Sequence, residues 1–368
     1  MPYSIGIVGL TNAGKSTIFS ALTSIKVPCE AYPFCTIDPN RGLVAAPDPR
    51  LQKLAELIKP EKVLPAAIEF VDIAGLVKGS HKGEGLGNQF LAEIRAVDAI
   101  AEVIRCFENA EVSHPEGSLD PARDAETVLF ELMQKDLETA EKRLDKAQKM
   151  LRVGEKSAQL EADLCAKMKT ALEQLQTLDR LSYHEDELPI LREMKPLTMK
   201  KRFFIANLGE EALSGQNLWL QKLEAYAAGK GIKVAPFYGK VEAEVHELDK
   251  SEQELFLKEM GIERSGLLEV IRAGREILDL VTFYTAVGGK ELRNWLVPRS
   301  ATAPVAAGKI HTDFESGFIK AEVITFEDFV RLGGEAAARK QGAVRVEGKD
   351  YLVQDGDIIH FRFKPKIV

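Results

Sequence analysis

A glycine-rich signature close to the N-terminus constrains the fold of this chain more than any other feature. Residues 5–8 read IGIV, a short apolar run typical of a buried parallel strand. They lead into residues 9–16, GLTNAGKS, which match the pattern G-x-x-x-x-G-K-[ST]. After this loop, Ile18, Phe19 and Leu22 share one face of an expected helix. A strand, a glycine loop and an amphipathic helix in this order predict an α/β domain that binds nucleotide phosphates.

The residue types of this loop each suit one task in phosphate binding. Gly9 and Gly14 allow the backbone N–H groups to turn toward phosphates, and the start of the helix adds the positive end of its dipole. Lys15 can reach the β- and γ-phosphates and neutralise charge during catalysis, while the Ser16 hydroxyl can ligate Mg²⁺. We therefore expect the phosphates to be bound by residues of this segment, namely Asn12, Ala13, Gly14, Lys15, Ser16 and Thr17.

A second motif favours a nucleotide-controlled switch. Residues 68–71, IEFV, read as another buried strand that ends at Asp72, and Gly75 follows three residues later. Asp72 is placed to support Mg²⁺, and the Gly75 N–H to reach a γ-phosphate. Residues 79–87 contain four glycines, which indicates either a switch segment or a flexible surface loop. Between the two motifs, Thr36 is the candidate for a further Mg²⁺ ligand, although its position alone would also suit a threonine at a strand edge.

Three longer runs make the similarity to a known family specific. They are GLTNAGKST at 9–17, YPFCTIDPN at 32–40 and DIAGLVKGSHKGEGLGNQFL at 72–91. With them the chain resembles, over nearly its whole length, the YchF / Obg-like ATPase family, part of the Obg-related P-loop NTPases. The resemblance implies a Ras-like, mostly parallel sheet, a preference for ATP over GTP, and binding to the ribosome.

The residues that would read the base depart from the usual guanine motif. GTPases read guanine with Asn-Lys-x-Asp after a strand, whereas residues 203–206 (FFIA) precede Asn207, Leu208, Gly209 and Glu210. Losing the Lys and the Asp removes a penalty against adenine, so the sequence favours relaxed or adenine-leaning specificity. The resemblance implies that Asn207 and Leu208 lie against the base; the alternative is that 207–210 is only a polar turn. Relatives carry small residues where this chain has Gly239-Lys240. The sequence therefore does not assign the residue that makes the last contact to the base.

The residue that orients the attacking water is not evident from the motifs. The position after the D-x-x-G motif holds Leu76, which cannot orient water as the Gln of Ras-like switches does. His81 has a suitable side chain, but relatives usually carry a small residue there. The resemblance implies that His114 reaches the water, although a lone histidine in a surface loop is more often incidental. For Arg95 and Arg105 we expect solvated side chains rather than phosphate contacts.

Differences in sequence pattern along the chain indicate three domains. Residues 120–199 contain one internal glycine and two apolar seams at 4-3 spacing, which predict an antiparallel helical coiled-coil hairpin inserted into the nucleotide domain. The seams are Met133, Leu137, Ala140, Leu144, Ala147 and Leu151, then Leu164, Met168, Ala171, Leu175 and Leu178. The nucleotide domain then spans 1–119 and 200–280. Residues 281–368 show alternating strands and an Asp-Gly turn, and resemble a β-grasp (TGS) domain.

Charge and composition limit the partners. The net charge of -7 argues against one large basic surface. Residues 281–368, however, hold 13 Lys+Arg against 11 Asp+Glu, a local net charge of +2. Four cysteines without CxxC spacing argue against a disulfide scaffold or a structural metal. With no signal-like N-terminus and no long apolar run, we expect a cytoplasmic monomer that does not enter a membrane. Given the family resemblance, we expect contacts to the ribosome's large subunit and to RNA through the TGS domain and the helical arm.

Taken together, these features predict a Mg²⁺-dependent NTPase that prefers ATP, uses GTP less well and acts as a ribosome-binding switch. Two alternatives stay open: a GTP-preferring switch, and a binding module in which nucleotide is a regulatory ligand and hydrolysis is incidental. A small-molecule kinase is disfavoured because the motifs leave no separate acceptor pocket and the glycine-rich loops resemble switches.

Overall fold

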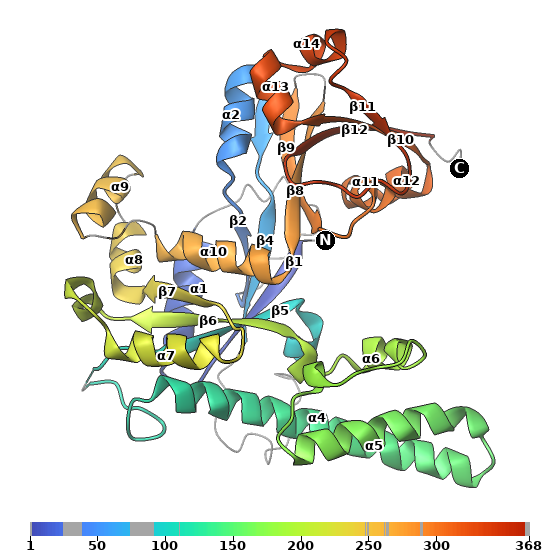
Figure 1. Cartoon of the computed structure of the whole chain (residues 1–368). Coiled ribbons are helices and arrows are strands. Elements are labelled where there is room, and N and C mark those ends of the chain that lie inside the picture. Colours follow the sequence, from blue (N-terminus) through green and yellow to red (C-terminus); the bar gives the residue numbers. More distant parts are fainter. Residues whose placement is uncertain are drawn as a thin grey trace.

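A computed structural model describes residues 2–24, 39–73, 92–109, 111–246, 248, 250–260, 262, 265–287 and 290–364. Thr36, Gly75, Leu76 and His81, which the sequence analysis singled out, lie outside the described residues. Figure 1 shows the described chain as a central sheet with its helices, a second sheet above it, and a long helical arm below.

The nucleotide domain is built on a six-stranded sheet in the order β2-β4-β1-β5-β6-β7. Only β2 runs antiparallel to its neighbour, β4, and the remaining pairs are parallel. The strands span Tyr3–Val8 (β1), Arg41–Ala45 (β2), Ala67–Asp72 (β4), Ala99–Arg105 (β5), Lys201–Leu208 (β6) and Val234–Tyr238 (β7). This mostly parallel sheet confirms the α/β fold class expected from the sequence.

Helices cover both faces of this sheet because its central strands are apolar on both sides. Lys15–Thr23 (α1) and Gly266–Ile277 (α10) bury one face, where Ile5, Phe70 and Phe203 lie. The first part of Pro121–Arg152 (α4) and Leu218–Ala228 (α7) cover the other face. Gly239–His246 (α8) follows β7 and is followed by Lys250–Glu259 (α9).

The arm is formed by α4 and Gln159–Glu173 (α5), which pack side by side, with Leu188–Met194 (α6) at its base (Figure 1). Asp120 begins α4 as its N-cap by accepting from the Arg123 N–H at 3.2 Å, and Pro121 follows in the first turn. The second seam is shorter than expected. Leu175 lies beyond the end of α5 with a φ of 56° and 66% exposure, because the chain turns there toward Leu178, which is buried.

The C-terminal region forms a second six-stranded sheet in the order β11-β10-β12-β8-β9-β3. Its strands are Leu280–Val287 (β8), Glu291–Pro298 (β9), Phe318–Thr325 (β10), Arg345–Glu347 (β11), Asp357–Phe363 (β12) and Lys62–Leu64 (β3). Ala303–Ile310 (α11) packs on one face through Ala303, Ala306 and Ala307, and is followed by Thr312–Ser316 (α12). Phe326–Leu332 (α13) and Glu335–Lys340 (α14) pack on the other face.

A segment from the first part of the chain joins this second sheet. Strand β3 pairs parallel to β9, with Val63 opposite Leu292. Pro49–Ile58 (α2) buries Leu51 and Leu54 against Tyr284 of β8. At its start Arg50 donates to Asp355 at 2.7 Å, and the Tyr284 hydroxyl donates to Asp48 at 2.8 Å. These contacts tie the two sheets together through residues far apart in the sequence. No helix in the described ranges is both long and apolar enough to cross a bilayer.

Candidate nucleotide-binding and hydrolysis site

The phosphate-binding loop packs tightly between β1 and α1. Gly9 has a φ of 151°, and a Cβ there would lie 2.5 Å from the Val103 carbonyl oxygen on β5. Gly14, the N-cap of α1, has a φ of 97°, and a Cβ there would lie 2.1 Å from Asn207 Nδ2. Both positions therefore require glycine, for backbone conformation and for space. Asn12 also lies in the left-handed region, with a φ of 64°.

Lys15 occupies the interior of this loop. Its side chain is buried, and Nζ donates to the Leu10 carbonyl at 2.9 Å. Burial lowers the pKa of Lys15, and the nearby Asp72 carboxylate opposes that shift. A neutral carbonyl is a weak partner for a buried ammonium, so the anionic oxygens of a bound phosphate would be a stronger one.

Ser16 and Asp72 bring two oxygen donors to the mouth of the loop. Asp72 ends β4, which pairs with β1 so that Ile7 lies opposite Asp72. Across this edge the Ser16 hydroxyl donates to Asp72 Oδ2 at 3.4 Å. Burial raises the pKa of Asp72, and the positive charge of Lys15 lowers it. A hydroxyl and a carboxylate are hard oxygen ligands of the kind Mg²⁺ prefers, so these residues fit such an ion. Thr17, next in α1, is exposed.

Asn207 connects the phosphate loop to the region where the base would bind. Its side chain is 5% exposed, and Nδ2 donates to the Ala13 carbonyl at 2.9 Å. A Cβ at Gly239 would lie only 2.8 Å from Asn207 Oδ1, so Asn207 also contacts the start of α8 closely. Leu208 is 2% exposed and packs its side chain with Leu223 and Ala227 of α7. Any contact of Leu208 with a base would therefore come from its backbone.

An ion pair near the base-reading position was not anticipated from the sequence. Glu210 stands where guanine-reading GTPases carry an aspartate, and its carboxylate lies 2.8 Å from Lys240 Nζ. The hydrogen bond that Lys240 donates to the Glu210 carboxylate raises the pKa of Lys240. In the sequence, Lys240 stands out only as a departure from relatives. The two residues lie 30 positions apart and meet because β6 and β7 are neighbours in the sheet.

The loop that carries His114 is folded around Arg105. The guanidinium donates to the carbonyls of Phe107, Asn109 and Val112 at 3.1, 3.2 and 3.0 Å. Arg105 is 5% exposed, so the expectation of a solvated side chain was wrong for this residue. It was also wrong for Arg95, whose partly buried guanidinium donates to Thr139 of α4 at 2.8 Å. Backbone carbonyls hold Arg105 and the Thr139 hydroxyl holds Arg95, and sequence spacing reveals neither kind of partner.

His114 is held by both of its ring nitrogens. Nε2 lies 2.9 Å from Asp124 Oδ2 in the first turn of α4, and Nδ1 accepts from the Glu116 N–H at 3.1 Å. Since Nδ1 is an acceptor, Nε2 carries the proton and donates to Asp124. The side chain is 8% exposed, unlike that of an incidental surface histidine. Burial raises the pKa of Asp124, and His114 opposes that shift.

The His114 loop also contacts the phosphate loop. Asn12 Nδ2 donates to the Ser113 carbonyl at 3.1 Å, one residue before His114. The structure therefore brings together most of the described residues that the sequence analysis named: Asn12, Ala13, Gly14, Lys15, Ser16, Asp72 and Asn207 in one site, with His114 beside it. A fold of this type with a lysine-containing phosphate loop defines a P-loop nucleoside triphosphatase of the GTPase class.

Comparisons with known proteins narrow this class to one family. Residues 4–165 match a family model described as "50S ribosome-binding GTPase", and residues 280–364 match the C-terminal model of YchF GTPases, described as a protein of unknown function (DUF933). The curated protein "Ribosome-binding ATPase YchF" of Pasteurella multocida is 48% identical over 363 residues, covering 99% of each chain. That of Bacillus subtilis is 45% identical over 365 residues, covering 99% of this chain and 100% of the relative.

A solved structure agrees over the whole length. The structure titled as the YchF GTPase of Schizosaccharomyces pombe matches with a TM-score of 0.85 and 34% identity, covering 98% of this chain and 97% of that one. The chain belongs to the YchF family.

Proposed function

We propose that this chain hydrolyses ATP in a Mg²⁺-dependent reaction and uses the nucleotide state to control its binding to the ribosome. The observation that carries the proposal is the convergence of Lys15, Ser16 and Asp72 at the mouth of one loop. Among the described residues, the hydrogen-bond acceptor of the Lys15 ammonium is the neutral carbonyl of Leu10. The relatives named ribosome-binding ATPases supply the activity and the partner by similarity.

In this site the residues have separate tasks. Backbone N–H groups between Asn12 and Thr17 bind the phosphates, and Lys15 leaves the Leu10 carbonyl to neutralise their charge. Ser16 and Asp72, with Thr36, would hold Mg²⁺, which would supply positive charge to offset that of the phosphates. Gly75 would donate its N–H to the γ-phosphate, so that loss of this phosphate releases the segment after Asp72.

Selection of the base would rest on the end of β6. Asn207 holds the phosphate loop, and the Leu208 backbone faces the base. The carboxylate of Glu210 is paired with Lys240 through Oε1, and this ion pair competes with the N1–H and N2–H₂ donors of guanine for the same group. This arrangement favours ATP and leaves GTP as a weaker substrate.

His114 is the proposed group that orients the attacking water. In the described conformation both of its ring nitrogens are occupied, so the imidazole must leave Asp124 before it can act. Replacing His114 by Ala should reduce hydrolysis by about 10²-fold or more and leave nucleotide affinity nearly unchanged. Unchanged turnover in this variant would remove His114 from the mechanism.

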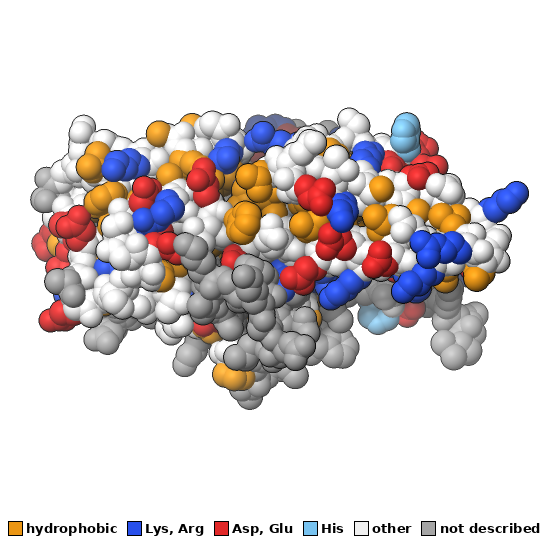
Figure 2. Space-filling model, turned by 90° about the horizontal axis from the view of Figure 1, so that it is seen from below, with side chains coloured by type: hydrophobic (Ala, Val, Ile, Leu, Met, Phe, Trp, Pro, Cys, Tyr) orange, Lys and Arg blue, Asp and Glu red, His pale blue; other side chains and the backbone are white. Residues whose placement is uncertain are grey.

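The same proposal extends to the domains and the partners. We propose a nucleotide domain at 1–119 and 200–280, a helical arm at 120–199 and a TGS domain at 281–368, with the arm and the TGS domain contacting RNA of the large subunit. Seen from the side of the arm, acidic and basic side chains are interspersed, so this face would make local contacts rather than present one large positive field (Figure 2). We expect the protein to act as a cytoplasmic monomer.

One titration and one kinetic experiment test the function. Calorimetric titration with non-hydrolysable ATP and GTP should give a lower Kd for ATP, and turnover of ATP should rise when ribosomes are added. A lower Kd for GTP would favour the GTP-preferring switch instead. The Lys15→Ala variant should lose both turnover and nucleotide control of ribosome binding. If it still supports function in cells, the chain is a binding module in which hydrolysis is incidental.

A further inference from the structure

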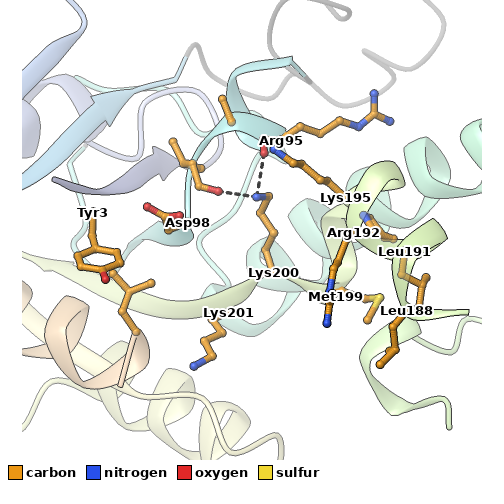
Figure 3. A pocket seen from close by; sticks show the side chains of 14 residues that line it. Tyr3, Arg95, Asp98, Leu188, Leu191, Arg192, Lys195, Met199, Lys200 and Lys201 are labelled. Atoms are coloured by element: carbon orange, nitrogen blue, oxygen red, sulfur yellow. Dashed lines mark hydrogen bonds between the residues drawn. The ribbon is translucent and has the colours of Figure 1, made fainter. Parts of the chain in front are cut away.

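A hollow of about 520 Å³ lies at the root of the arm, away from the nucleotide site. Its walls come from the amino ends of β1, β5 and β6, represented by Tyr3, Asp98 and Lys201, and from α6 of the arm (Figure 3). The phosphate loop follows the carboxyl end of β1, so the hollow and the nucleotide site lie at opposite edges of the sheet. No part of the proposed reaction uses this hollow.

The floor of the hollow is apolar. Tyr3, Val97, Leu191 and Met199 are among the side chains that line it, and Leu188 at its rim is 37% exposed. A hollow of this size with an apolar floor suits one or two inserted side chains.

The rim of the hollow is positively charged. Among the described residues, five cationic ones line it, Arg95, Arg192, Lys195, Lys200 and Lys201, against one carboxylate, that of Asp98. Asp98 Oδ2 already accepts from the Ser4 N–H at 2.8 Å and from the Ser4 hydroxyl at 3.1 Å. In a protein of net charge -7, such an excess of positive charge around one hollow is a local feature.

Two of these cations have internal partners, and three do not. Lys200 donates to the carbonyls of Arg95 and Val97 (Figure 3), and burial lowers its pKa to about 8. Arg95 donates to Thr139. Arg192, Lys195 and Lys201 are exposed, and no carboxylate among the described residues pairs with them.

The positive charge continues into a neighbouring hollow of about 490 Å³. The two hollows share Met199, Lys200 and Lys201. The described charged residues that also line the second are the cations Arg180, Arg202 and Lys230 and the carboxylate Asp179. An extended ligand could therefore place an apolar group in the first hollow and run its negative charges along the rim toward the second.

We propose that this bipartite hollow docks an acidic peptide segment, one apolar side chain of which fills the floor beside Leu188 and Leu191. Charge complementarity selects an anionic partner, because no carboxylate in the part of the chain that the structure describes pairs with the three exposed cations. The floor favours an aliphatic or aromatic peptide side chain over a nucleobase. Its described lining is mainly aliphatic, with Leu191 and Met199, and offers the Tyr3 ring alone for base stacking. The proposal is independent of ATP hydrolysis and of nucleotide preference.

Selection from a phage-displayed library of random dodecapeptides tests the proposal on the full-length protein. Peptides enriched on the unmodified chain should carry two or more Asp or Glu residues beside a Leu or an aromatic residue. In fluorescence anisotropy, the Arg192→Glu/Lys201→Glu variant should bind these peptides at least about ten-fold more weakly. The Leu188→Ser variant should also bind these peptides more weakly, because the substitution makes the edge of the apolar floor polar.

Matched controls separate docking from general effects of charge. The variant Lys142→Glu/Lys146→Glu makes the same charge change at two exposed positions of α4 and should leave peptide affinity unchanged. Melting curves and ATP turnover of all variants should match those of the unmodified chain. The proposal is overturned if no enriched peptide is sensitive to Arg192→Glu/Lys201→Glu. It is also overturned if a labelled RNA duplex, and no peptide, binds in a manner sensitive to that variant.

Discussion

His114 Nε2 donates to the Asp124 carboxylate at 2.9 Å, which joins the loop beside the phosphates to the first turn of the arm. Asn12 adds a second link from the phosphate loop to Ser113, at 3.1 Å. A displacement of α4 by a partner bound to the arm would therefore act directly on His114. Because Asp124 restrains the imidazole, it is a positioning residue in the proposed mechanism rather than one that touches nucleotide.

Weakening this restraint should raise basal hydrolysis. In Asp124→Asn the acceptor is neutral, and a hydrogen bond to a neutral group is weaker than one to a charged group by about 1 kcal/mol. We therefore expect ATP turnover to rise by roughly three- to ten-fold. The double variant Asp124→Asn/His114→Ala should fall to the level of His114→Ala alone. Steady-state release of phosphate in the absence of ribosomes measures the turnover of both variants. A lower turnover in Asp124→Asn would show that Asp124 activates His114 instead of holding it back.

Anchoring of the phosphate loop by Asn207 should affect ATP and GTP equally. The Asn207→Ala variant loses the bond from Nδ2 to the Ala13 carbonyl and leaves that buried oxygen without its partner, at a cost of about 1–2 kcal/mol. We expect titration calorimetry to show both nucleotides weakened by roughly ten-fold, with their ratio preserved. The control is Asn217→Ala, which removes the cap of α7 and a bond to Cys106 but no contact to the loop. A changed ratio in Asn207→Ala would mean that Asn207 reads the base.

The pair Glu210–Lys240 should limit the binding of GTP. In Lys240→Ala the Glu210 carboxylate is free to accept from guanine, so the affinity for GTP relative to ATP should increase by about three-fold. Adding Glu210→Gln to this variant should abolish the gain, because an amide is a poorer acceptor for two guanine donors. Displacement of a fluorescent nucleotide analogue from the protein by ATP and by GTP measures this ratio of affinities. Equal ratios in all three proteins would exclude Glu210 from base selection.

The parts of the site that the sequence predicted are those that short segments determine. The phosphate loop needs Gly9 and Gly14 for conformations that its own eight residues specify, and Asp72 follows a strand recognisable from its apolar run. The contacts that were missed join distant segments. Arg105 was expected in solvent because its partners are backbone carbonyls, which carry no sequence signal.

The second sheet illustrates the same limit. Strand β3 is three residues long and has little pattern of its own, and it pairs with β9 more than 220 positions later in the chain. Leu51 and Leu54 indicate an apolar helix face but do not say which sheet covers it. Only the tertiary fold decides that α2 packs on the C-terminal sheet.

Glu102 of β5 should make the stability of the fold depend on pH. Its side chain is fully buried, and neither carboxylate oxygen has a hydrogen-bond partner among the described residues. The Arg202 guanidinium lies 3.8 Å from Glu102 Oε2. Burial raises the pKa of Glu102 to about 8, with Arg202 opposing the shift. In the unfolded chain this carboxyl ionises at its ordinary pKa of about 4.3. Between these two values the folded state retains a proton that the unfolded state releases. The contribution of Glu102 to stability is therefore greatest below the unfolded pKa and is lost as the pH rises toward 8.

Glu102→Gln should remove this dependence, because an amide of the same size stays neutral at every pH. We expect the melting temperature of the variant, measured relative to the unmodified chain, to rise steadily from pH 5 to pH 8. The difference in unfolding free energy between the two proteins changes by at most about 1.4 kcal/mol per pH unit. Glu126→Gln, at an exposed position of α4, should show no such trend. A difference in melting temperature that stays constant over this range would mean that Glu102 is ionised in the folded protein and that Arg202 compensates its charge.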